Sequence, residues 1–374
     1  MKKEQIVRIQ DLVGLIHALY PSALAEEWDN VGLQVGDPAA AVKTALICLD
    51  PSEKALAAAR SAGAQAIISH HPLIFRPLKN IQPTDETGRI LFQAIRDGIA
   101  VFSAHTNLDR GRDGLNDWLA RTLQLTQVLP LALGGSLVKL VVFVPSGHEE
   151  VVSEALFAAG AGQVGRYDRV SFRSAGQGSF RPGSGAQPFI GTLGETARVD
   201  ELRLEVVLPR ESVNKVVSKM IKAHPYEEVA YDLVPLLNSP ADIGLGRIGR
   251  LSEPATLASL AERVKQGLGL SSLRLVGHAE HRIVKVAVCG GSGASLLSEA
   301  KRQGADVLVT GDVKYHEARQ AESLNMALID ASHFGTERIM VPNLARVLKE
   351  EAIKKKLEVE FIEMEGEGDP FTTV

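Results

Sequence analysis

Short apolar runs alternate with helix-like stretches in the first third of the chain. The runs are Ala45–Asp50, Ala66–Ser69 and Ile99–Ser103, and an alanine-rich stretch at Ser52–Ala62 separates the first two. Short buried strands that alternate with helices are typical of a parallel sheet built from βαβ units. The pattern therefore predicts an α/β fold for this part of the chain.

The same alternation returns near the C-terminus. Strands are predicted at Val286–Cys289, Val307–Thr310 and Ala327–Asp330, and a helix over Ser295–Gln303. In both regions the third strand is followed by a histidine and, four residues later, by a carboxylate: His105 with Asp109, and His333 with Glu337. We interpret the two regions as an internal repeat. The alternative is two ordinary βαβ segments whose spacing coincides.

A segment with a different order of predicted strands and helices separates the two halves. It predicts strands over Lys139–Val144 and Arg203–Leu208, helices over Glu149–Ala159 and Glu211–Ala223, and a mobile hairpin in the Gly/Ser-rich stretch Ser174–Gln187. This order resembles a ferredoxin-like unit. The predicted fold class is therefore α/β. Two similar halves, residues 1–129 and 239–374, are expected to form one domain, and an α+β insert over residues 130–238 is expected to interrupt it.

Composition narrows the class of protein. The chain has 374 residues, of which 45% are hydrophobic, and a net charge of −4, which gives no electrostatic footprint for nucleic-acid binding. Two cysteines, Cys48 and Cys289, exclude a disulfide scaffold and an all-cysteine zinc site. No apolar run is long enough to span a membrane. The first residues predict an amphipathic helix rather than a signal peptide. We therefore expect a cytoplasmic protein with no membrane or nucleic-acid partner.

Polar side chains gather where the predicted strands end, which is where open α/β sheets build their sites. Adjacent His70 and His71 follow one strand, and the two histidine–carboxylate pairs follow others. Residues four apart lie on the same face of a helix, so each pair can point at one ion. The alternative is that these side chains are helix caps and hydrogen-bonding core residues.

Imidazoles and carboxylates without a thiolate suit zinc, iron(II), manganese or cobalt, and disfavour calcium or an iron–sulfur cluster. The candidates outnumber the ligands of one tetrahedral zinc ion. Two ions about 3.5–4 Å apart, bridged by a carboxylate and a water, are the economical interpretation.

Five motifs, in order along nearly the whole chain, resemble the GTP cyclohydrolase I type 2 homologues, also called Nif-three-like dinuclear-metal proteins. They are Glu27–Gly36, Ser69–Pro72, Ala104–Asp109, Thr310–His316 and Asp330–Glu337. The resemblance implies a two-metal centre, and Glu337 is its expected bridge. The implied metal ligands are His70, His71, Asp109, His333 and Glu337.

The resemblance also implies a homohexameric toroid whose metal sites face the inner cavity. The long members of the family carry a central insert similar to PII and CutA proteins, and Ala223–Glu228 matches its His-Pro-Tyr-Glu motif. We expect His105 to support the metals by hydrogen bonding more than by ligation. For Asp312 and His316, a proton-shuttling or orienting role stands beside a structural one. Trp28 belongs to a predicted structural turn, with a place in the cleft wall as the alternative.

Two functions remain open at this point. The first is a metal-dependent hydrolase that acts on a nucleotide, by GTP cyclohydrolase-like chemistry or phosphoester hydrolysis, through a water that bridges two divalent ions (zinc, iron or manganese). The second is a non-catalytic metal-binding assembly with a regulatory or interaction role and an effector-sensing insert. The nucleotide substrate is implied by the resemblance alone.

Overall fold

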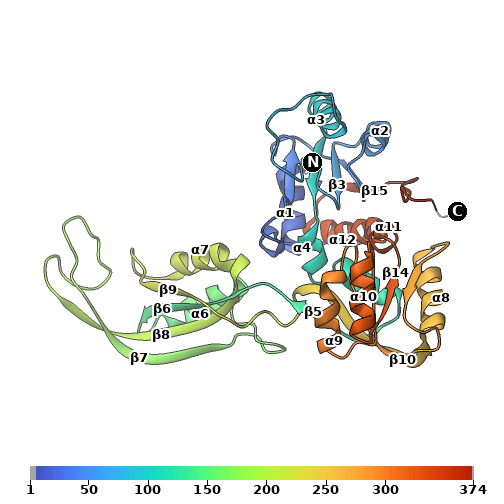
Figure 1. Cartoon of the computed structure of the whole chain (residues 1–374). Coiled ribbons are helices and arrows are strands. Elements are labelled where there is room, and N and C mark those ends of the chain that lie inside the picture. The colour runs from blue at the N-terminus through green and yellow to red at the C-terminus, as the bar shows by residue number, and fades with distance from the viewer. Residues whose placement is uncertain (1–5, 373–374) are drawn as a thin grey trace. The chain divides into compact units, whose positions relative to one another are not determined.

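The computed structural model describes residues 6–372 and separates two compact units (Figure 1). The first, here called the two-part unit, comprises the chain up to Leu133 together with the chain from Asp242 onward. The second, the inserted unit, is Gly134–Ala241. Among residues 6–372, no helix is both long and apolar enough to cross a membrane.

The N-terminal sheet of the two-part unit has the strand order β1-β4-β3-β2-β15. Its strands are β1 (Gly32–Val35), β2 (Thr44–Cys48), β3 (Ala66–Ser69), β4 (Ala100–Ser103) and β15 (Glu360–Glu363). All pairs are parallel except β1 with β4. Alternate residues of β2 enter different cores, because Ala45 and Ile47 pack on one face of the sheet and Leu46 and Cys48 on the other. The three central strands are therefore continuous apolar runs, as expected for a parallel sheet that is covered on both faces.

Helices cover both faces of this sheet. They are α1 (Ile9–Leu19) and α12 (Met340–Lys355) on one face, and α2 (Glu53–Ser61) and α3 (Glu86–Asp97) on the other. Ser52 caps α2 by accepting a hydrogen bond from the backbone N–H of Ala55. Gly98 ends α3 in the left-handed conformation that glycine adopts most readily. Local sequence signals thus place the helices between buried strands.

The C-terminal sheet has the order β11-β14-β13-β12-β10-β5. Its strands are β5 (Thr126–Leu133), β10 (Gly244–Thr256), β11 (Arg274–Val276), β12 (Arg282–Val288), β13 (Val307–Thr310) and β14 (Ala327–Asp330). The covering helices are α5 (Leu115–Thr122) and α8 (Leu257–Leu268) on one face, and α9 (Leu297–Arg302) and α10 (Tyr315–Ser323) on the other. Two short helices, α4 (Thr106–Arg110) and α11 (His333–Glu337), follow β4 and β14.

The two sheets share one arrangement. The parallel strands β4-β3-β2 and β14-β13-β12 have the same spatial order. In the first set β1 pairs antiparallel with β4, and in the second set β11 pairs antiparallel with β14. The fold class is thus confirmed as two similar α/β halves. Each half also contributes a strand to the other's sheet: β15 from the C-terminal end pairs with β2, and β5 from the N-terminal half pairs with β10.

The inserted unit has the order β6 (Leu137–Pro145), α6 (Glu149–Ala158), β7 (Ser171–Phe180), β8 (Ala197–Pro209), α7 (Val213–Ala223) and β9 (Tyr231–Pro235). Its antiparallel sheet has the order β7-β8-β6-β9, which is the ferredoxin-like arrangement. The Gly/Ser-rich stretch differs from its prediction. Ser174–Phe180 is a regular part of β7, paired residue by residue with β8, and the irregular loop lies after it.

The junctions of the inserted unit generate a prediction. Leu133 pairs with Gly244 across β5 and β10, so the two ends that the insert connects lie side by side. Replacing Gly134–Ala241 by a short Gly/Ser linker should therefore leave a folded protein. Circular dichroism should show a cooperative thermal transition. Loss of that transition with several linker lengths would contradict the prediction and make the insert integral to the fold of the two-part unit.

Candidate metal centre

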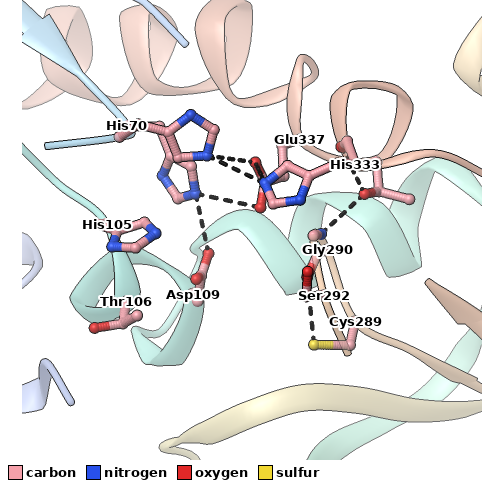
Figure 2. A network of polar contacts seen from close by, with 12 residues as sticks. His70, His105, Thr106, Asp109, Cys289, Gly290, Ser292, His333 and Glu337 are labelled. Carbon is pink, nitrogen blue, oxygen red and sulfur yellow. Dashed lines mark hydrogen bonds and ion pairs between the residues drawn. The ribbon is translucent and has the colours of Figure 1, made fainter. Parts of the chain in front are cut away.

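Histidines and carboxylates from both halves of the two-part unit meet at the carboxyl ends of its parallel strands. His70 and His71 follow β3, Asp109 lies in α4, and His333 and Glu337 are the first and last residues of α11. Figure 2 shows His70, Asp109, His333 and Glu337 pointing toward one another. The turn after β3 is fixed because the Ser69 hydroxyl donates to the carbonyl of His71 (2.7 Å) and the Ser103 hydroxyl to that of His70 (2.8 Å).

Glu337 stands at the centre of the cluster, with a side chain that is only 4% exposed. Its Oε2 lies 3.0 Å from Nε2 of His71 and 3.0 Å from Nε2 of His333. Its Oε1 lies 3.7 Å from Nε2 of His70, which is in turn 3.6 Å from Oδ1 of Asp109. The two oxygens of one carboxylate therefore face two different groups of potential ligands.

Nδ1 of each imidazole, the ring nitrogen that does not face the cluster, contacts an oxygen atom that fixes the orientation of the ring. His71 Nδ1 lies 2.8 Å from a carboxylate oxygen of Asp50, and His333 Nδ1 lies 2.7 Å from one of Asp312. His70 Nδ1 lies 2.8 Å from the carbonyl oxygen of Ala104. An Nδ1–H that donates to such an acceptor leaves the lone pair of Nε2 free, which is how metal-ligating histidines are usually oriented.

Two buried atoms of the cluster have no hydrogen-bond partner among the described residues: Nε2 of His70 and Oδ1 of Asp109. Buried polar atoms are almost always paired, so an unpaired donor or acceptor of this kind requires an explanation. Both atoms face the same space, beside Oε1 of Glu337. A metal ion would satisfy both atoms, and nitrogen with carboxylate oxygen is a suitable donor set for a borderline divalent ion. The residues present therefore fit a metal ion.

The electrostatics of the cluster also favour positive charge. Burial alone would raise the pKa of Glu337, but His70, His333 and His71 hold it well below its usual value. Burial and the charge of Glu337 raise the pKa of Asp109, against the lowering influence of His70. Burial lowers the pKa of His71, but the hydrogen bonds that its ring donates to the carboxylates of Asp50 and Glu337 outweigh burial and raise the pKa to about 10. Without a metal, protons on the imidazoles balance the buried carboxylates.

The side chain of Asn116 joins the N-terminal half to the C-terminal half beside Glu337. The side chain of Asn116 donates to the carbonyl of Asp109 (3.0 Å) and accepts from the backbone N–H of Gly290 (2.9 Å). Gly291 has a φ of +58°, and a Cβ there would lie 2.2 Å from Oε1 of Glu337. Glycine at this position is therefore required both by its conformation and by the room that the carboxylate needs.

His105 lies beside the cluster. Its ring centroid is 5.1 Å from that of His70 and 5.6 Å from that of His71. Its Nδ1 lies 2.9 Å from Oδ1 of Asp29. Burial by itself would raise the pKa of Asp29, but hydrogen bonds from His105 and Thr106 lower it to about 2. His105, His70 and His71 each offer a ligand atom within 4.8 Å of the others, and so do His71, His333 and Glu337.

The structure brings together all five residues expected as ligands, with His105 adjacent and Asp312 in contact with His333. His316 is different: among residues 6–372 its described interaction is a ring contact with Tyr315, and no contact with the cluster is described for it. Sequence reasoning missed Asp29, Asp50 and Asn116 as supporting residues. Asp50 had a usable signal, because it ends a predicted strand and therefore lies at the edge of the sheet where the site forms.

These features define an α/β protein with a candidate metal centre where its two similar halves meet. Residues 7–370 match the model of the Duf34/NIF3 (NGG1p interacting factor 3) family. The chain belongs to this family.

Relatives of similar length support the same assignment. A Bacillus subtilis protein named GTP cyclohydrolase 1 type 2 homolog is 42% identical over 365 residues, which cover 97% of this chain and 98% of that protein. The crystal structure of a Bacillus cereus protein related to NIF3 is 41% identical, with a TM-score of 0.88 over 99% of this chain and 100% of that one. A Staphylococcus aureus crystal structure is 28% identical, with a TM-score of 0.79 and the same coverage.

The carboxylates behind the histidines generate a prediction. Asp50→Asn should weaken divalent-metal binding by about 10- to 100-fold, because it removes the charge that orients His71 and makes it more basic. The fold should persist, because the Asp50 side chain is 57% exposed. Titration of metal-stripped protein, followed by calorimetry, measures the affinity. Asp168→Asn is the matched control, because Asp168 has no described contact with the cluster. Equal affinities for the two variants would contradict the role of Asp50.

Proposed function

We propose that this protein is a metal-dependent hydrolase that binds two divalent ions per subunit and acts on a nucleotide. The observation that carries the proposal is the position of Glu337, whose two carboxylate oxygens face separate ligand groups. One group is His70 with Asp109, and the other is His71 with His333.

The distances support one ion in each group. Ligand atoms about 2.1 Å from a tetrahedral ion lie about 3.4 Å from one another. Nε2 of His70 lies 3.6 Å from Asp109 and 3.7 Å from Glu337. Nε2 of His71 and Nε2 of His333 are 3.3 Å apart, and each is 3.0 Å from Glu337. Glu337 would bridge the two ions, and zinc, iron(II) and manganese all suit the ligands.

Bound divalent ions would supply a water molecule acidic enough to lose its proton near pH 7. The chain contributes the group that moves protons. His105 is the imidazole beside the cluster that is not needed as a ligand, and its Nδ1 is held by Asp29. Its Nε2 is therefore free to accept a proton or to donate one to a leaving group.

A nucleotide substrate is supported by two observations. Relatives carry the name GTP cyclohydrolase 1 type 2 homolog. In addition, Trp28 and Phe75 are 60% and 46% exposed, although large aromatic side chains are usually buried. Their rings contact each other at 5.8 Å, and their centroids lie 6.1 and 6.5 Å from that of His105. A base stacked on this pair would hold the rest of a nucleotide near the metal centre.

The proposal extends to the assembly. Six copies would form a ring with the metal centres facing its inner cavity, and sedimentation analysis of the protein tests this.

Both cysteines are free and buried, which suits the reducing environment of the cytoplasm. The competing function is a metal-binding regulatory assembly without turnover.

The bridging role of Glu337 can be tested by metal analysis. Glu337→Gln keeps the shape of the side chain and removes its charge, so it should reduce the occupancy of both ions together. Asp109→Asn should empty one site preferentially, because Asp109 faces only the Oε1 group. Elemental analysis with anomalous diffraction measures each occupancy. Wild-type occupancy of both sites in Glu337→Gln would mean that Glu337 is not the bridge.

Turnover tests the activity itself. Metal-loaded protein should hydrolyse GTP or a member of a panel of nucleotide phosphoesters, and removal of the metal should abolish the reaction. Trp28→Ala should raise KM about tenfold or more, since base stacking on an aromatic ring contributes about 1–3 kcal/mol. Phe92→Ala, at an exposed aromatic residue of α3, is the matched control. Absence of metal-dependent turnover across the panel would favour the regulatory assembly.

A further inference from the structure

The inserted unit contains a cavity of about 680 Å³, which is within the size range of small-molecule sites. Its walls come from the β7–β8 hairpin, from the loop that connects these strands, and from the turn that follows α7. Every residue of the lining belongs to the inserted unit, so the cavity is independent of the metal centre.

Aromatic rings form one side of the cavity. The ring centroid of Tyr226 lies 5.9 Å from that of Phe180 and 6.4 Å from that of Phe189, and all three residues line the space. Phe189 is 53% exposed, so its ring is not buried in the core of the unit. Aromatic faces of this kind bind apolar bodies, and they also attract cations.

A carboxylate lies in this aromatic wall. Glu201 is 9% exposed, and its Oε1 accepts a hydrogen bond from the hydroxyl of Tyr226 (3.0 Å). That is the one hydrogen bond described for this carboxylate among residues 6–372, and no ion pair is described for it there. Arg203, a nearby cation in the lining, pairs with Glu205 instead (3.1 Å). A largely buried carboxylate without a cationic partner is costly, so its charge suits a ligand that supplies one.

The surrounding backbone is built around Glu201. A Cβ at Gly178 would lie 2.1 Å from Oε2 of Glu201, so glycine at this position lets the carboxylate keep its present place. His224 fixes the turn after α7: its Nε2 donates to the carbonyl of Phe143 (3.0 Å), and its Nδ1 accepts from the backbone N–H of Tyr226 (3.1 Å). The motif that begins with His224 therefore positions the hydroxyl that contacts Glu201.

We propose that this cavity binds a small organic cation. Its apolar or aromatic body would lie among Phe180, Phe189 and Tyr226, and its protonated nitrogen would donate to the free Oε2 of Glu201. Arg181 and Glu228 also line the cavity, neither with a described ion pair among residues 6–372, and their opposite charges offset each other, so Glu201 is the carboxylate on which the proposal depends. The site would give the inserted unit a ligand of its own.

Three indole compounds with different charges test the proposal on the full chain. Tryptamine is cationic, tryptophol is neutral and indole-3-propionate is anionic. Ligand-observed saturation-transfer NMR titrations measure their affinities. Tryptamine should bind at least about tenfold more tightly than tryptophol, because a charged hydrogen bond to a shielded carboxylate is worth that much. Indole-3-propionate should bind most weakly. Equal affinities, or no saturable binding of tryptamine, would overturn the proposal.

Variants locate the effect. Glu201→Gln should abolish the preference for tryptamine over tryptophol. Glu211→Gln is the matched control, because Glu211 belongs to the same unit, does not line the cavity and has no described contact with its lining among residues 6–372; it should keep the preference. Tyr226→Phe keeps the aromatic ring and leaves the carboxylate of Glu201 in place, so this variant should also prefer tryptamine over tryptophol. It provides the second test if Glu201→Gln does not fold. Preference that survives Glu201→Gln, or is lost in Tyr226→Phe, would contradict the assignment. The assignment would also be contradicted if Phe189→Ala changed the oligomeric state of the protein but not its affinity for tryptamine, because another copy of the chain would then fill the cavity.

Discussion

The packing of α12 on the N-terminal sheet is the contact on which the candidate metal centre depends. Met340, Leu344 and Leu348 of this helix are completely buried in a core shared with β2, β3 and β4. Glu337 ends α11, three residues before α12 begins, so the docking of α12 decides where its carboxylate lies. Beyond α12 the chain enters the same sheet as β15. Burial of apolar surface thus holds a C-terminal carboxylate against N-terminal histidines.

That burial has an electrostatic cost, which explains the composition of the cluster. Glu337 is almost inaccessible to water, and a buried carboxylate needs compensating positive charge. His70, His71 and His333, whose pKa values are raised, supply it as protons when no metal is present, and divalent ions could replace those protons. The carboxylates Asp50, Asp312 and Asp29 stand behind three of the rings, farther from the centre. The arrangement is therefore a layered one: carboxylate, imidazole, then carboxylate again, with each layer orienting the next.

The sequence predicted the parts of this structure whose signals are local. Strands β2, β3, β13 and β14 are apolar except at one end because both sheet faces are covered, and such runs can be recognised from the sequence alone. Strand β15 is only partly buried and has glutamates at both ends, so its place beside β2 follows from the docking of α12 alone. Likewise His70 and Glu337 could be proposed as ligands from motifs, whereas the supporting role of Asn116 depends on a neighbour far along the chain.

The repeat also explains why the two halves contribute differently. His70 and His71 follow β3, and the equivalent positions after β13 are Gly311 and Asp312. A Cβ at Gly311 would lie 2.6 Å from the backbone of Ser332 and His333, so no imidazole fits there. Asp312 instead holds His333 from behind, at 2.7 Å. One half thus supplies adjacent histidines, and the other supplies a single oriented histidine and the central carboxylate. An asymmetric centre follows from steric exclusion at one glycine within a nearly symmetric fold.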